Sequence, residues 1–242
     1  MKLSRNTKFL PLAALLAGAA ALAVREALYA FAVDDRGLLV PGHPLGWVLG
    51  ALTVLVMVYL IWNVVKGADV TFRLPDMAAA AGTIFCAAAM AVTVAFVSPM
   101  TPGYTALAWR LLGCAAAVGL VVQGVGYASG RKPGYVPELL TCLFCLFHII
   151  DHYRPWSGNP QMMDSLLALA AMGAMTLFSL YCACDGVGLP RRRLWLGTGL
   201  CALFFCAAEL LSGYLLLDLG FIAWVLVRLY TPRKGETGNG AA

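Results

Sequence analysis

Charged side chains are scarce in this sequence. Asp, Glu, Lys and Arg together make up 12% of the 242 residues, whereas hydrophobic residues make up 61%. Soluble domains contain about 25% charged and about 45–50% apolar residues, so this composition excludes a soluble globular domain. We expect an integral membrane protein whose main partner is the lipid bilayer.

Motifs of known reactions are also absent. The sequence has no Gly-rich phosphate loop, no pair of carboxylates in a catalytic motif and no nucleophile beside an evident base. All eight cysteines fall inside apolar segments, where a thiol behaves as a small hydrophobic group, and this argues against an exported disulfide scaffold. We therefore expect a protein that is not an enzyme and has no catalytic residue and no cofactor.

Apolar segments of spanning length recur along the whole chain. A membrane-crossing helix needs about 20 apolar residues, and Pro, Gly and basic residues separate the segments. The pattern predicts an all-α fold, a polytopic transmembrane helix bundle of about eight spans that forms one integral membrane domain, 1–242. The expected spans are 9–33, 45–65, 77–97, 105–127, 136–152, 160–185, 194–211 and 215–230.

The two ends of the chain leave alternatives open. The first span follows Lys2, Arg5 and Lys8 and could instead be a cleaved signal peptide, which would leave seven spans; we favour an uncleaved helix. The apolar stretch after the three arginines 191–193 is too long for one span, so we divide it at Ser212-Gly213, although a re-entrant hairpin would fit the same charges. We expect the Gly-rich tail, 231–242, to be disordered and cytoplasmic.

The net charge of +5 is a topology signal and does not indicate nucleic-acid binding. With eight spans that start inside, all but four of the 17 Lys and Arg residues lie on the cytoplasmic side. The exceptions are Arg36 and Arg154 outside, and Arg25 and Arg110 within spans. We therefore expect both termini in the cytoplasm.

The expected span 136–152 carries a stripe of cysteine and histidine side chains, which can bind metals. Cys142, Cys145, His148 and His152 fall within an arc of about 120° on a helix, but they extend over about 15 Å of rise and cannot close around one zinc ion. His148 and His152 alone could chelate a metal or help to ligate a haem, yet the only other histidine is His43. We expect packing and polar partners here, and no metal.

Depth in the membrane gives a more informative pattern. Alternating the spans places ionisable residues from several segments in the outer half of the bilayer, where such groups usually face the bundle interior. We interpret them as an outward-facing polar cluster and a candidate ligand site, or as an ion-pair network that fixes helix register. We predict that Arg25 pairs with Glu209 or Asp218, and Glu26 with Arg110. The candidate residues are Arg25, Glu26, Arg110, His148, Asp151, His152, Glu209 and Asp218.

Two further carboxylates have a simpler interpretation. Glu138 follows Pro137 in a first helical turn, and Asp164 also lies near a helix start. A negative charge suits the positive end of the helix dipole, so we assign neither residue to a site.

The segment Arg154-Pro155-Trp156-Ser157-Gly158-Asn159-Pro160, followed by Asp164 and by Arg191-Arg192-Arg193, resembles a group of uncharacterised multi-pass membrane proteins of anaerobic Gram-positive bacteria. The similarity covers the fifth to the seventh span. It implies residence in a bacterial plasma membrane and adds no catalytic residue.

These observations favour two classes of function. The first is binding or passage of a small solute or ion through the outward-facing cluster, in a transporter or sensor. The second is a non-enzymatic membrane subunit or scaffold, whose small-residue helix faces would bind another membrane protein or a second copy of this chain.

Overall fold

The computed structural model describes residues 9–33, 39–40, 42–66, 76–97, 99, 103–130, 134–156, 163–189 and 191–230, and only the backbone of 154–156 and 163–165. Within these ranges the chain forms eight α-helices and no strand, apart from an isolated bridge between Val33 and Leu39. The tail 231–242 and the expected helix cap at Asn159-Pro160 lie outside the described residues. The helices are α1 (Leu10–Phe31), α2 (Pro44–Val65), α3 (Asp76–Phe96), α4 (Tyr104–Ala128), α5 (Val136–Trp156), α6 (Met163–Gly186), α7 (Arg192–Glu209) and α8 (Leu215–Tyr230).

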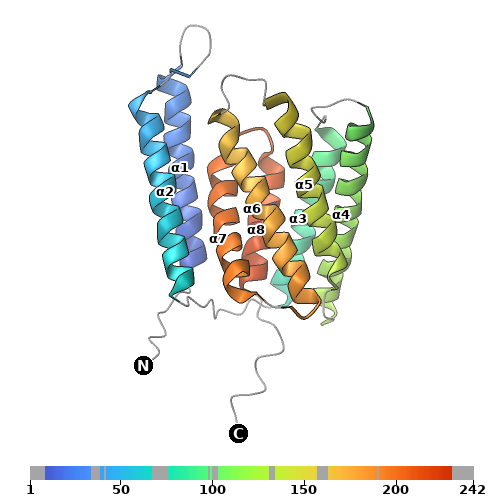
Figure 1. Ribbon diagram of the computed structural model, residues 1–242. Helices are drawn as coiled ribbons and strands as arrows, with labels where there is room; N and C mark the ends of the chain where they lie inside the picture. The colour runs from blue at the N-terminus through green and yellow to red at the C-terminus, as the bar shows by residue number, and fades with distance from the viewer. Residues whose placement is uncertain are drawn as a thin grey trace, which may run out of the picture.

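Helices α3 to α8 form a closed ring of neighbours (Figure 1). Each contacts the next along the chain, and α8 returns to contact α3. Helices α1 and α2 stand side by side at one edge of the bundle, and both contact α7. The start of α1 and the end of α8 lie at the same end of the bundle. We call this the proximal end, and the opposite end the distal end.

Side chains fill the interior of the ring. The largest fully buried residues are aromatic and come from five helices: Trp109 on α4, Phe144 on α5, Phe178 on α6, Phe204 on α7, and Phe221 and Trp224 on α8. Buried hydroxyl groups are satisfied within their own helices, because each donates a hydrogen bond to the carbonyl oxygen four residues earlier. Thr83, Thr93, Thr141 and Ser179 do this.

Six of the helices, α1 to α6, are long and apolar enough to cross a membrane. Large apolar side chains also cover much of the outer surface, more than a soluble monomer exposes. The fold is therefore compatible with a helical membrane bundle. Helices α7 and α8 are shorter, with 18 and 16 residues, and more than half of their residues are buried. Their crossing of the membrane stays a prediction.

The break between α7 and α8 falls at Ser212-Gly213, as the sequence predicts. Gly213 adopts φ +111°, a conformation that residues with a side chain rarely take. The Ser212 amide donates a hydrogen bond of 2.9 Å to the Glu209 carbonyl oxygen, which ends α7. Because of this tight turn, the last residue of α7 and the first turn of α8 both lie at the distal end.

Helix α1 packs closely on α7 through a glycine. A Cβ atom added at Gly18 would lie 2.5 Å from the Phe204 carbonyl oxygen and 2.6 Å from the Ala207 Cβ atom. Such distances are too short for non-bonded contact, so only glycine allows this approach. The contact also brings Arg25, two turns further along α1, towards the end of α7.

Gly18→Ala should therefore lower the free energy of unfolding by about 1–3 kcal/mol, because the added methyl group would force α1 away from α7. The matched control is Gly50→Ala in α2, where a Cβ atom would meet nothing within 4 Å; it should be neutral or stabilise by up to about 1 kcal/mol. Unfolding of the detergent-purified protein by added SDS, followed by circular dichroism, measures both. Equal effects of the two substitutions would contradict the close contact.

Candidate functional site

An ion pair joins α1 to α7 at the distal end. Arg25 Nη1 lies 3.5 Å from Glu209 Oε2, and both side chains are buried. Arg25 also donates to the Ala208 carbonyl oxygen at 3.5 Å, and its guanidinium lies over the Tyr29 ring. The predicted pairing of Arg25 with Glu209 is confirmed.

Asp218 lies beside this pair in the first turn of α8. It is 0% exposed, and neither of its carboxylate oxygens accepts a hydrogen bond from any described residue. Arg25 and Glu209 both interact with it electrostatically, but no described cation lies within ion-pair distance. Glu209 Oε2 also accepts no hydrogen bond. We call Arg25, Glu209 and Asp218 the distal trio; with both carboxyl groups ionised, it is one positive charge short.

A second distal group is built around the two histidines of α5. Trp109 on α4 donates from its indole Nε1 to His148 Nδ1 at 3.0 Å. Because an indole nitrogen can only donate, His148 Nδ1 must carry a lone pair. This bond therefore assigns the neutral form of His148, with its proton on Nε2.

The His152 ring stacks on His148, with 3.9 Å between ring centroids. Its Nδ1 lies 2.9 Å from the His148 carbonyl oxygen, and its Nε2 lies 2.5 Å from the Tyr214 hydroxyl group. A carbonyl oxygen only accepts, so Nδ1 donates to it, and Nε2 of the neutral ring accepts from Tyr214. Burial raises the pKa of Tyr214 to about 12, so the hydroxyl keeps its proton at any ordinary pH.

These bonds use three of the four ring nitrogens. Chelation by two histidines requires one lone pair from each ring, so the pair cannot chelate a metal in this arrangement. The described residues contain no group of three or more His, Cys, Asp or Glu side chains that could hold one. Asp151 is buried next to His152, with 3.8 Å between Asp151 Oδ2 and His152 Nδ1.

The predicted pair of Glu26 and Arg110 is wrong. Both side chains are exposed, and no ion pair joins them in the described part of the chain. Helix α1 lies against α7 and α2, outside the ring to which α4 belongs. The eight candidate residues thus separate into the distal trio, a group formed by His148, Asp151 and His152, and two exposed residues.

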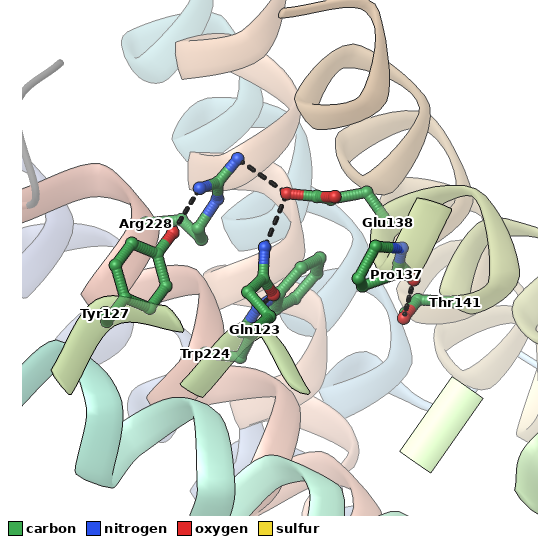
Figure 2. A network of polar contacts seen from close by, with 7 residues as sticks. All are labelled: Gln123, Tyr127, Pro137, Glu138, Thr141, Trp224 and Arg228. Atoms are coloured by element: carbon green, nitrogen blue, oxygen red, sulfur yellow. Dashed lines mark hydrogen bonds and ion pairs between the residues drawn. The ribbon is translucent and has the colours of Figure 1, made fainter. Parts of the chain in front are cut away.

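A third polar group lies near the proximal end, inside the ring (Figure 2). Arg228 Nη2 on α8 lies 3.0 Å from Glu138 Oε1 on α5, and Arg228 Nη1 donates to the Tyr127 hydroxyl group on α4. Gln123 donates from Nε2 to the same Glu138 oxygen at 2.6 Å and accepts from Trp224 Nε1 at 3.4 Å. We call these five residues the proximal network. Its two charges cancel.

Sequence reasoning missed this network. It assigned Glu138 to the dipole of its helix and counted Arg228 among the cytoplasmic charges. Depth in the membrane could have indicated the network, because three of its residues lie within a few residues of the cytoplasmic end of an expected span. They are Gln123, Glu138 and Arg228. Which faces of the three helices meet is information that hydropathy does not contain.

The cysteines lie between and around these polar groups. Those in the described residues are all free thiols. Cys86 on α3, Cys145 on α5 and Cys206 on α7 are fully buried in one apolar cluster, and Cys206 interacts electrostatically with Asp218. The surroundings of Asp218 are therefore mostly apolar groups and thiols.

No protein-family model matches this chain, and comparisons with curated proteins and with solved structures find no similar protein.

Glu138→Gln should lower the free energy of unfolding by about 2–4 kcal/mol, because it leaves the mostly buried Arg228 without a carboxylate. The double variant Glu138→Gln, Arg228→Gln should lose less than the sum of the two single variants, since neither charge remains. SDS unfolding of the four proteins measures the coupling. Arg193→Gln, an exposed charge at the start of α7, is the control and should change stability by less than about 0.5 kcal/mol. Additive losses would contradict the pairing.

Proposed function

We propose that this chain is a multi-pass integral membrane protein that binds a small solute or ion carrying one positive charge at the distal trio, for transport or sensing. The observation that carries the proposal is Asp218, a fully buried carboxylate whose oxygens accept no hydrogen bond from the described residues. Ionisable groups inside a membrane bundle usually mark a ligand or ion pathway.

The charge balance of the trio supports a cationic ligand. Arg25 and Glu209 neutralise each other at 3.5 Å, which leaves Asp218 as the uncompensated charge. A buried charge without a partner costs several kcal/mol. One added positive charge removes that cost, whereas an anionic ligand would add to the excess negative charge of the trio.

In this proposal all eight helices span a bacterial plasma membrane, with the proximal end and both termini in the cytoplasm. Exposed basic residues at the proximal end support this orientation, because cytoplasmic loops are rich in Lys and Arg. The distal trio then faces outward. The close contact of Gly18 with α7 and the ion pair of Arg25 favour a retained first span over a cleaved signal peptide. The exposed residues are Lys66, Arg191, Arg192 and Arg193.

Thermal unfolding of the detergent-purified protein in a panel of alkali cations, small amines and pH values tests the proposal. A ligand at 100 times its dissociation constant should stabilise the native protein by about 2.7 kcal/mol. Asp218→Asn should abolish this response, because it removes the uncompensated charge. The charge-matched control, Asp76→Asn at the exposed start of α3, should keep it. A response retained by Asp218→Asn, or no response to any cation or to pH, would contradict the proposal.

The surface of α2 favours a second candidate function, that of a non-enzymatic membrane subunit or scaffold. Gly46 and Gly50 lie four residues apart, and a Cβ atom at either would meet nothing within 4 Å. Large apolar side chains are exposed beside them, including Trp47 and Val54. This combination of small and apolar residues is typical of helices that dimerise in membranes.

Gly50→Leu should leave the stability of the isolated chain unchanged, because the position is open, and should break association with a membrane-protein partner or a second copy. The mass of the complex in detergent and the stoichiometry of co-purified chains measure association. If the wild-type protein already has the mass of one chain and carries no stoichiometric partner, the face contacts lipid alone.

A further inference from the structure

We propose that the cation bound at the distal trio is a proton, held by the Asp218 carboxyl group. The proposal rests on the proposed function and names its ligand. It follows from what surrounds Asp218, from the charge balance of the trio, and from the polar groups that lie one turn away.

A divalent metal cation in this position would have too few protein ligands and one positive charge more than the trio lacks. Hard cations such as magnesium and calcium take about six to eight oxygen ligands, and the trio offers only three oxygens that accept no hydrogen bond: the two of Asp218 and Glu209 Oε2. Leu217 and Phe221 are fully buried on either side along α8, and the Cys206 thiol interacts electrostatically with Asp218. A proton needs no coordination shell, so an apolar pocket suits it.

Two hydrogen-bonding side chains, Tyr214 and His152, lie near Asp218 at the distal end. Tyr214 is partly exposed, and the Asp218 amide donates to the Tyr214 carbonyl oxygen at 3.0 Å, which fixes the two residues one helical turn apart. The Tyr214 hydroxyl group is hydrogen-bonded to His152. Hydroxyl and imidazole groups both donate and accept, so this pair can exchange protons with water at the distal surface, one helical turn from Asp218.

The exchange is simple in atoms and charge. A proton from water on the distal side forms an O–H bond with one Asp218 oxygen, and the carboxylate becomes a neutral carboxylic acid. The trio is then neutral, with Arg25 and Glu209 still paired. Release breaks the same O–H bond and returns the proton to water.

The groups that face Asp218 set the direction of its pH dependence. Glu209 and Cys206 from α7 and Arg25 from α1 interact electrostatically with Asp218. Helix α3, which packs against α8 at Gly220, carries the Cys86 thiol, which interacts with Cys206. Only one of these groups, Arg25, is a cation, and Glu209 engages it. The native state therefore holds a proton that an unfolded aspartate releases near pH 3.9. Above about that pH the unfolding equilibrium constant should rise tenfold per pH unit, until the native protein also releases the proton.

Infrared spectroscopy of the detergent-purified full chain near neutral pH is the direct test. We expect a carbonyl stretch of a protonated carboxylic acid, shifted when aspartate side chains are labelled with carbon-13, which identifies an aspartic acid without any substitution. Asp218→Asn should remove this band. The matched control, Asp151→Asn, which changes the other buried aspartate of the distal end, should keep it.

Unfolding measured against pH, in sodium, potassium and a large organic cation, completes the test. We expect the tenfold rise per pH unit in all three salts and its loss in Asp218→Asn. Suppose that the aspartic-acid band is missing and that one cation stabilises the protein, an effect that Asp218→Asn abolishes. This result would contradict the inference that the ligand is a proton and would leave the proposed function standing. A missing band with no effect of pH or cations would overturn both. A band that Asp218→Asn retains would assign the proton to another residue and overturn this inference.

Discussion

Charge compensation inside an apolar bundle is the constraint on which this structure depends. A charged group buried among apolar helices must find an opposite charge on a neighbouring helix or lose several kcal/mol. Arg228 and Glu138 meet this requirement between α8 and α5, and Arg25 and Glu209 meet it between α1 and α7. Each pair therefore fixes how two helices face each other. Asp218 is the exception, because neither of its carboxylate oxygens has such a partner among the described residues.

The two charged residues of α8 lie at different depths in the ring. Asp218 and Arg228 are ten residues apart, which is about 15 Å along a helix. Between them lie apolar residues and thiols, among them Phe221 and Cys206. The proximal network is neutral and joins α4, α5 and α8 through an ion pair and hydrogen bonds, although Glu138 Oε2 and Arg228 Nε make no hydrogen bond with a described residue. The distal trio is unbalanced. This asymmetry is what we expect of a bundle that is sealed at one end and receives a cation at the other.

Much of the fold was predictable because helix position follows from local sequence. Apolar length, prolines and basic residues predict where helices begin and end, and Gly213 marks the break between α7 and α8. Depth along each helix was also predictable, which is why Arg25 and Glu209 were matched correctly. The face of each helix was not. Glu26 follows Arg25 in the sequence but points about 100° away, onto the exposed side of α1.

The same limit explains the proximal network and the histidines. Glu138, Gln123 and Arg228 come from three helices that meet only because the ring closes through α8 and α3. Which nitrogen of His148 carries the proton depends on Trp109, a residue 39 positions away on another helix. Tertiary contacts of this kind determine the protonation state and the hydrogen-bond partners of a side chain. A single sequence without its fold gives only the residue types.

The most direct measurement of the central claim is the stability of a series that changes only the charge of the distal trio. At a pH where unbound carboxyl groups are ionised, the account predicts that Arg25→Gln is the least stable protein, because two buried carboxylates then lack a cation. Wild type should be intermediate. Asp218→Asn and the triple variant Arg25→Gln, Glu209→Gln, Asp218→Asn, both neutral, should be the most stable. If Asp218→Asn is less stable than wild type at this pH, Asp218 already has a partner and the claim of an unbalanced charge is contradicted.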